Sequence, residues 1–297
     1  MGINFSRLLT LKYGNSISNY LGTDYSVVSV GRVMTCVLGM VVRREREIRE
    51  FIETPFYRIL ATIGEQGQTF EGEWRAVKGS KWFESFDLYK ENGFKEREKA
   101  QQVIDYLTQE QPVTGQIASI EKKKEKKNPP LLFNLAELQN ECSKRFKISP
   151  DETLKIAQEL YEKKLTTYPR TDARVLSTAV AKEIHKNLNG LMKYESAVLF
   201  LQEIVGFGSH KGLAKTRYVN DKQITDHYAI IPTGQGMSAL SGLSWTSRAV
   251  YDVIVRRFLS IFYPAAVYQK VAITTKVKEE SFFASFKVLA EPGYLKV

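Results

Sequence analysis

The chain has 297 residues, of which 43% are hydrophobic and 26% charged, a composition typical of a folded protein of about two domains. Lys and Arg outnumber Asp and Glu by 43 to 33, so the formal charge is +10. This excess favours a polyanionic partner such as nucleic acid, although a generic basic protein explains the charge equally well. The chain contains no run of about 18 apolar residues and no basic-then-apolar leader, so we expect a cytoplasmic protein that neither spans a membrane nor binds one.

The two cysteines, Cys36 and Cys142, lie far apart and outside any Cys-x-x-Cys pair. Their spacing argues against a disulfide framework and against a structural zinc site. We therefore expect two buried thiols in a reducing compartment and no metal site in this chain.

The first segment, to about residue 50, is expected to end in a helix. From Val33 onwards, apolar residues recur at spacings that place them on one helical face. Ser29 precedes this pattern and is the expected N-cap. Arg32 would then lie in the first helical turn, where free backbone N–H groups favour an anion, and with Ser29 and Thr35 it could clamp a phosphate. An exposed arginine beside an ordinary capped helix is an equally good interpretation.

The segments at residues 51–128 and 265–297 show the alternation of strands. Strands are expected at 56–61, 69–76, 114–120, 267–277 and 281–289. The lysine-rich run 121–127 precedes Asn128-Pro129-Pro130 and predicts a solvated linker, with phosphate contact as the minor alternative. The last five residues, 293–297, are expected to form a strand.

The segment between them, residues 129–264, is expected to be mainly helical. Leu135–Phe146 forms one predicted helix, and Ser149-Pro150-Asp151-Glu152 is a capping box that starts the next. A further helix is expected after Ser244 or Thr246, with an apolar face that carries Val250, Val253, Ile254 and Phe258.

These segments predict an α+β multidomain protein. It would combine part of a helical base domain at 1–50 with a discontinuous β domain at 51–128 and 265–297. The helical domain at 129–264 would be inserted into the β domain, and the two chain crossings between them would form a hinge.

The most informative segment follows the predicted helix that starts at the capping box. Two lysines and a β-prone Thr-Thr lead to Tyr168, and Pro169 biases Tyr168 toward an extended conformation. Arg170 follows two residues later, so a phenol and a guanidinium can be presented to one phosphate. A phenol has an ordinary pKa of about 10 and needs nearby cations to become a nucleophile. A guanidinium can bind the charge that develops on the phosphate oxygens.

Each of these residues also has an ordinary interpretation. A given tyrosine is far more often a packing residue than a nucleophile. Arg170 alone could be a surface charge, Asp172 a helix cap, and His227 a core residue. For His210, in a glycine-rich basic segment, a mobile loop is the better interpretation.

The segment Thr-Tyr-Pro-Arg-Thr-Asp at 167–172 resembles the active-site segment of type IA DNA topoisomerases, most closely that of the bacterial topoisomerase III branch. Three further matches occur in the family's order. Asn4-Phe5-Ser6-Arg7 resembles the segment after the metal-binding Toprim domain, and residues 29–35 resemble the family's Ser-x-Gly-Arg-Val-Gln-Thr element. Residues 225–233 resemble its His-containing Ala-Ile-x-Pro-Thr motif. Met34 departs from the pattern, because the family usually has a glutamine there that contacts DNA.

The resemblance implies roles for these residues. Tyr168 would become linked to a 5′ phosphate of a cut single strand, Arg170 would bind that phosphate, and His227 would lie beside it. DNA contacts would come from Ser29, Arg32, Thr35, Thr171 and Asp172. The β domain would be the family's arch and hinge, and the helical domain, winged-helix-like in fold, would carry the tyrosine.

The resemblance also implies parts that these residues do not supply. The family cuts and reseals with an acidic Asp-x-Asp cluster in its Toprim domain, and no Asp-x-Asp occurs here. We therefore expect an internal fragment of an enzyme that requires Mg²⁺, weak or inactive without the Toprim domain of the same chain. Single-stranded or underwound duplex DNA is the expected partner. A recombinase or relaxase fits poorly, because His185, His210 and His227 are too dispersed. A non-catalytic module that binds single-stranded DNA is the remaining alternative.

Overall fold

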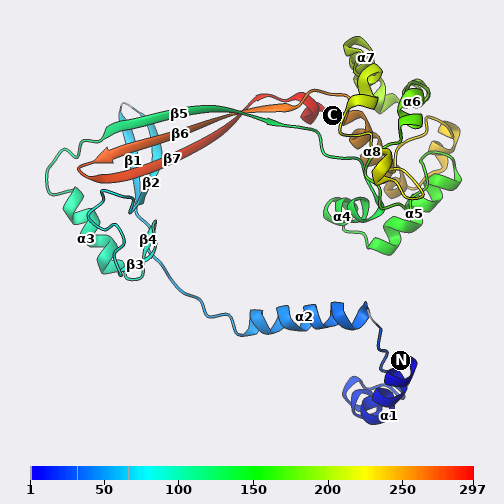
Figure 1. Ribbon diagram of the computed structural model, residues 1–297, viewed down its shortest axis with the longest axis horizontal. Coiled ribbons are helices and arrows are strands. Elements are labelled where there is room, and N and C mark those ends of the chain that lie inside the picture. Colours follow the sequence, from blue (N-terminus) through cyan, green and yellow to red (C-terminus); the bar gives the residue numbers. More distant parts are fainter. Residues whose placement is uncertain (1, 32, 66) are drawn as a thin grey trace. The chain divides into compact units, whose positions relative to one another are not determined.

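The computed structural model describes residues 2–31, 33–65 and 67–297 (Figure 1). The chain divides into two compact units. The first comprises residues 1–58 and 85–103, and the second comprises residues 59–84 and 104–297. Among the helices that the structure describes, none is both long enough and apolar enough to span a membrane.

The first unit contains helices α1 (Gly2–Leu21) and α2 (Met34–Arg49), the short strands β3 (Leu88–Lys90) and β4 (Gly93–Phe94), and the start of α3 (Arg97–Leu107). Helix α1 holds the segment that follows it through two hydroxyls. Ser6 Oγ accepts from the Val30 N–H at 2.8 Å, and Thr10 Oγ1 accepts from the Val28 N–H at 2.9 Å.

This anchoring explains why the predicted N-cap at Ser29 is wrong. Residues 28 and 30 are tied to α1, so the next helix begins only at Met34, and no side-chain cap is present at its start. The Thr35 hydroxyl accepts instead from the Gly31 N–H at 3.2 Å. Arg32 lies outside the described residues. Cys36 is exposed on α2, so the expectation of a buried thiol is wrong for Cys36 and confirmed for Cys142.

The second unit contains an antiparallel five-stranded sheet of order β1-β2-β7-β6-β5. Its strands are β1 (Leu60–Glu65), β2 (Gln68–Arg75), β5 (Gln116–Lys127), β6 (Ala266–Val277) and β7 (Glu280–Glu291). The alternation at 69–76, 267–277 and 281–289 therefore predicted strands that are present, whereas the one expected at 56–61 begins only at Leu60.

The predicted linker at 121–127 is wrong, because these residues continue β5. They pair with β6 from Glu121 opposite Ala272 to Lys127 opposite Ala266. The charges are accommodated because β5 is an exposed edge strand. Glu125 forms ion pairs with Lys270 on β6 and Lys287 on β7, and hydrogen bonds from these lysines lower the pKa of Glu125 to about 2.

A buried carboxylate fixes the loop after β2 to the sheet. Glu280 is fully buried and accepts from Trp74 Nε1 at 2.6 Å, Ser80 Oγ at 2.7 Å and the Lys81 N–H at 2.8 Å. These three donors replace the hydrogen bonds to water that the carboxyl group loses on burial.

The helical region of the same unit contains the main core, which is built from the buried faces of α4 to α8. The helices are α4 (Leu135–Phe146), α5 (Pro150–Glu162), α6 (Thr178–Leu191), α7 (Val198–Phe207) and α8 (Trp245–Ser260), with short 3₁₀ helices η1 (Glu195–Ala197), η2 (Ser209–Lys215), η3 (Asp221–Gln223) and η4 (Met237–Gly242) between them. Side-chain caps start four of the five α-helices, at Asn134, Ser149, Ser177 and Ser244. The caps at Ser149 and Ser244 and the buried face of α8 confirm the predictions.

Two further local predictions are wrong in this unit. His210 lies in η2 rather than in a loop, because the chain continues directly from α7 into this 3₁₀ helix. Residues 293–296 form η5 (Gly293–Lys296) rather than a strand, because Tyr294 is buried in the helical core and its N–H donates to the Pro264 carbonyl.

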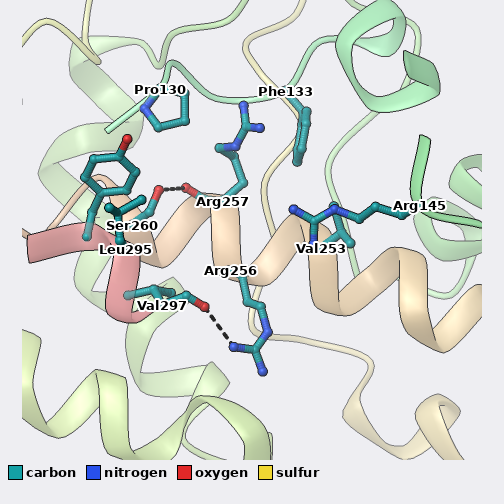
Figure 2. A pocket seen from close by; sticks show the side chains of 10 residues that line it. Pro130, Phe133, Arg145, Val253, Arg256, Arg257, Ser260, Leu295 and Val297 are labelled. Carbon is teal, nitrogen blue, oxygen red and sulfur yellow. Dashed lines mark hydrogen bonds between the residues drawn. The ribbon is translucent and has the colours of Figure 1, made fainter. Parts of the chain in front are cut away.

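An arginine-rich pocket of about 230 Å³ lies between α8 and η5 (Figure 2). Arg256 donates to Asp252 at 2.6 Å and to the Val297 carbonyl at 2.8 Å. Arg257 lies 4.0 Å from the centre of the Phe133 ring and donates to the Leu131 carbonyl at 3.0 Å. Burial lowers the pKa of Arg257. These contacts hold η5 and the segment before α4 against α8.

Candidate active site

The segment that carries Tyr168 begins where α5 ends. Helix α5 stops at Glu162, and Lys164 has a φ of 61°, in the left-handed region that reverses the chain. The Leu165 N–H donates to the Leu160 carbonyl at 2.9 Å, and the Leu165 side chain is fully buried. Leu165 therefore anchors the turn, and the residues after it leave the helix in a defined direction.

The next two residues pair with the segment that contains the histidine motif. Thr166 bridges to Pro232 as an isolated antiparallel pair. The Thr167 N–H donates to the Ile231 carbonyl at 3.0 Å. The Thr167 hydroxyl donates to the Ala229 carbonyl and accepts from the Ile231 N–H, both at 3.0 Å. Two motifs some 60 residues apart in sequence are thereby joined.

Because of this pairing, Tyr168 lies beside His227. Their ring centroids are 4.5 Å apart, with an interplanar angle of 47°. Tyr161, from the last turn of α5, packs edge-on against Tyr168 with a centroid distance of 5.3 Å. The three rings line an open pocket of about 370 Å³ that also includes Lys164.

Thr171 holds His227 from the other side. Its hydroxyl donates to the His227 carbonyl at 2.7 Å and accepts from the Ala173 N–H at 3.1 Å. Thr171 is buried, so in this structure its hydroxyl positions the histidine segment. Asp172 is exposed, and its carbonyl accepts from Asn134 Nδ2 at 3.2 Å.

Arg170 is exposed and faces a different pocket from that of Tyr168. It lines a hollow of about 430 Å³ on the surface of α5, together with Asp151, Glu159 and Glu162 among others. The structure thus brings Tyr168 and His227 together, and it places Arg170 on the adjoining surface. Ser29 and Thr35 belong to the first unit.

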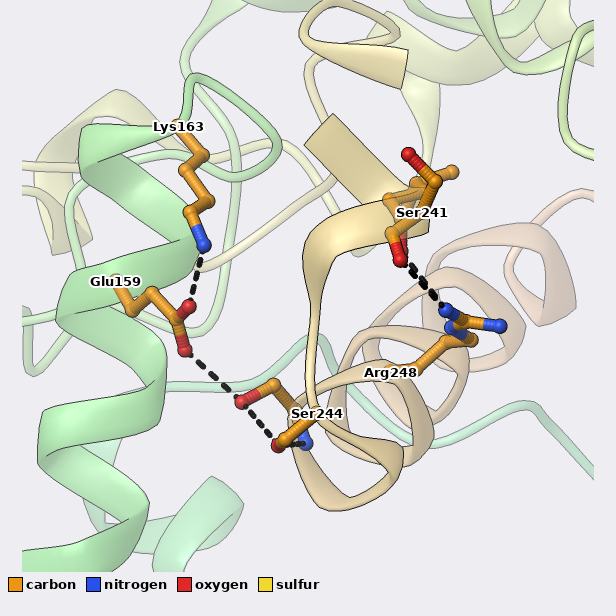
Figure 3. Close-up of polar contacts among 7 residues, drawn as sticks. Glu159, Lys163, Ser241, Ser244 and Arg248 are labelled. Atoms are coloured by element: carbon orange, nitrogen blue, oxygen red, sulfur yellow. Dashed lines mark hydrogen bonds and ion pairs between the residues drawn. The ribbon is translucent and has the colours of Figure 1, made fainter. Parts of the chain in front are cut away.

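A polar network fixes the C-terminal end of α5, and sequence reasoning missed it (Figure 3). Glu159 accepts from Lys163 Nζ at 2.5 Å and from Ser247 Oγ on α8 at 2.9 Å. The hydrogen bond from Lys163 is the main cause of the lowered pKa of Glu159. The network therefore joins α5 to α8 one turn before the tyrosine segment.

A glycine supports the same turn. Gly236 has a φ of +67°, and a Cβ there would lie 2.1 Å from the Lys163 carbonyl oxygen. Only glycine allows this approach without displacement of the backbone. The signal in the sequence was the Gly-x-Gly at 234–236, directly after the histidine motif.

Within the described residues, no group of three or more His, Cys, Asp or Glu side chains is arranged to hold a metal ion. The residues around Tyr168 offer aromatic rings, hydroxyls, a lysine and the amide of Gln235 but no carboxylate, and this set does not fit Mg²⁺.

The chain is similar to known proteins along its whole length. A family model described as DNA topoisomerase matches residues 1–297. DNA topoisomerase 3 of Bacillus subtilis strain 168 is 34% identical over 300 residues, and its counterpart in Bacillus cereus strain ATCC 14579 is 31% identical over 305 residues. Each alignment covers the whole of this chain but 36% of the relative, so the chain spans little more than a third of their length.

Among solved structures, full-length topoisomerase I from Thermotoga maritima is similar in fold. The TM-score is 0.60 at 23% sequence identity, and the match covers 98% of this chain and 44% of that one. The observed helices and antiparallel sheet are thus an arrangement already known from that protein. Because the family model covers the whole sequence and the curated relatives exceed 30% identity, the chain belongs to the type IA DNA topoisomerase family, with relatives of the topoisomerase III kind.

Proposed function

We propose that Tyr168 is the nucleophile of a DNA topoisomerase reaction, in which one DNA strand is cut through a 5′-phosphotyrosine link and later resealed without ATP. The observation that carries this proposal is the contact between the rings of Tyr168 and His227, 4.5 Å apart at an open pocket. A packing tyrosine would be enclosed by apolar side chains, whereas Tyr168 is half-exposed beside an exposed histidine and a lysine.

The bonds and charges of the step balance within the DNA and the protein. The Tyr168 oxygen forms a bond to phosphorus, and the bond from phosphorus to the 3′ oxygen of the neighbouring nucleotide breaks. The phenol loses one proton and the 3′ oxygen gains one. The phosphotyrosine ester retains the energy of the broken link, so reversal by the 3′ hydroxyl reseals the strand.

The cations near Tyr168 have separate roles in this proposal. Lys164 lines the same pocket and supplies a positive charge beside the point of attack. Arg170 is exposed and only two residues away, and it turns from the α5 surface to bind the phosphate oxygens when DNA is present. His227 donates to the phosphate or positions it. Asp172 and Thr171, with Ser29, Arg32 and Thr35, remain the predicted contacts to flanking DNA.

The complete reaction requires parts beyond these residues. We propose that the Toprim domain of the family, together with Mg²⁺, supports cleavage and resealing, and that this chain alone is weak or inactive. The substrate is single-stranded or underwound duplex DNA. The helical region moves on its two crossings to the sheet and allows another strand to pass.

Covalent trapping with end-labelled single-stranded DNA tests this function. The chain is assayed alone and with a separately made Toprim domain plus Mg²⁺, each beside Tyr168→Phe. We expect an adduct that forms with the Toprim domain and disappears in Tyr168→Phe. Salt-sensitive DNA binding without an adduct in any mixture would contradict the proposal and leave a non-catalytic single-strand binding module.

A further inference from the structure

The pocket of Tyr168 adjoins a second and larger one. This second pocket has a volume of about 640 Å³ and is bounded on its far side by helix α6. The two pockets have four lining residues in common, namely Thr167, Tyr228, Thr233 and Gln235. The two pockets therefore adjoin along these residues, and we call the two together the α6 groove.

The charges that line the α6 groove are mainly positive. Lys182 and Lys186 lie one turn apart on α6, and Lys164 lies at the Tyr168 end. Glu183 is the one carboxylate among the lining residues, and its ion pair with Lys186 is solvent-exposed at 2.7 Å. Within the described part of the chain, no carboxylate lies within ion-pair distance of Lys182. The groove thus presents two available cations. Lys182 has no ion-pair partner among the described residues, and the exposed ion pair of Lys186 contributes little to stability.

The walls of the α6 groove are held together by direct backbone packing. Asn187 Nδ2 donates to the Pro232 carbonyl at 2.9 Å. A Cβ on Gly190 would lie 2.2 Å from the Gly234 carbonyl oxygen, and one on Gly234 would lie 2.6 Å from that of Asn187. Helix α6 therefore packs directly against the loop that follows the histidine motif, the segment that also pairs with Thr167 beside Tyr168.

We propose that the α6 groove holds the nucleotides next to the attacked phosphate, with Lys182 and Lys186 bound to backbone phosphates and Tyr228 available to stack on a base. This inference rests on the proposed function, because it takes Tyr168 as the point of attack. Cations that follow a groove, interleaved with aromatic rings, are the pattern of single-strand binding without sequence preference. The volume lies within the range of about 300–1,000 Å³ that is typical of ligand sites, so a nucleotide fits.

The test is the salt dependence of binding of a labelled single-stranded oligonucleotide to the 297-residue chain. The variant carries Lys182→Gln and Lys186→Gln. Its matched control carries Lys144→Gln and Lys147→Gln, which remove the same charge from exposed positions at the end of α4, outside both pockets. Each phosphate contact to a single strand adds about 0.7 to the steepness with which the logarithm of the binding constant falls with the logarithm of the salt concentration. With two contacts removed, this slope should be about 1.4 shallower in the groove variant. The control should keep the slope. Equal changes in the two variants would overturn the proposal.

A photocrosslink locates the strand independently of the slope. With a thio-substituted base beside the central phosphate, we expect crosslinks in the peptide that contains residues 178–191 and a loss of those crosslinks in the groove variant. Crosslinks confined to other helices would overturn the proposal. The two proposals fail separately: an adduct at Tyr168 with an unchanged slope rejects the α6 groove, whereas groove-dependent binding without an adduct rejects the reaction. Thermal unfolding of every variant excludes misfolding as the cause.

Discussion

At the scale of single residues, Thr167 is the link on which the candidate site depends. Its hydroxyl bonds to two backbone groups of the segment after His227, the Ala229 carbonyl and the Ile231 N–H. The sequence could identify Tyr168, Arg170 and His227, because their motifs stand out in order along the chain. It could not show that a neighbouring threonine, rather than the tyrosine itself, joins the two motifs, since any hydroxyl in a β-prone run has the same appearance.

We expect Thr167→Val to lower the free energy of unfolding by about 1–3 kcal/mol, because a buried N–H and carbonyl lose their partner. The yield of the covalent adduct should fall further than stability alone explains, since two of the contacts that hold the His227 segment beside Tyr168 are lost. Urea unfolding and the trapping assay measure the two effects. Thr167→Ser keeps the hydroxyl and should restore the adduct, and an unrestored adduct would show that the methyl group matters instead.

The two cysteines should differ in reactivity. Cys142 is fully buried, and burial raises its pKa to about 11, so the reactive thiolate is scarce at pH 8. Cys36 is exposed. Alkylation of the native protein, followed by peptide mass spectrometry, should label Cys36 quickly and Cys142 only after denaturation. Equal labelling rates in the native protein would contradict the burial of α4 against the core.

At the scale of elements, the end of α5 is held by one carboxylate. Glu159 bonds to Lys163 within the helix and to Ser247 on α8. Its pKa is lowered, so its contribution to stability is present above the ordinary carboxyl value of 4.5 and is lost as the pH falls through the lower folded-state value.

Glu159→Gln should therefore lower the free energy of unfolding by about 1 kcal/mol at neutral pH, a value reduced for solvent screening because the side chain is 37% exposed. The difference from the unaltered protein should disappear in acid, once Glu159 is itself protonated. Urea unfolding at neutral pH and in acid measures this difference in the free energy of unfolding. A difference that persists in acid would assign the effect to packing rather than to charge.

Two glycines with nearly equal φ angles allow the stability cost of backbone strain to be distinguished from the cost of a steric clash. Gly236 has a φ of +67° and faces the Lys163 carbonyl, whereas Gly208 has a φ of +64° and open space around its missing Cβ. Gly208→Ala should cost about 1 kcal/mol from strain alone. Gly236→Ala should cost clearly more, because the turn that leads to Tyr168 must move. Equal losses in thermal unfolding would mean that this turn yields easily.

The elements differ in how well the sequence predicted them. The capped helices α4, α5 and α8 and alternating strands such as β6 were predicted, because their apolar residues follow the period of the structure, whereas α6, capped at Ser177, was not predicted. The second half of β5 was not, because an exposed edge strand of lysine and glutamate has no buried face to reveal it. Helix α1 also escaped prediction, since few of its residues are buried and its pattern is weak.

At the scale of the whole molecule, stability should be unevenly distributed. All residues of α2 are exposed, whereas α8 lies across the core of the helical region, with most of one face buried. Local opening costs little where few apolar contacts are lost. Hydrogen exchange followed by mass spectrometry should show the amides of α2 exchanging first and those of α8 last. Comparable protection of the two helices would contradict this difference in burial.

The domain boundaries expected from the sequence remain a prediction, although the observed ladder gives one of them a physical meaning. Lys127 and Ala266 are paired neighbours on β5 and β6, at the positions where the chain enters and leaves the helical region. Strand β7 ends at the same place, with Glu291 opposite Val267, and continues into η5, which is held against α8. A pull on the helical region is therefore shared by three neighbouring strands, and it does not shear β7 against β6.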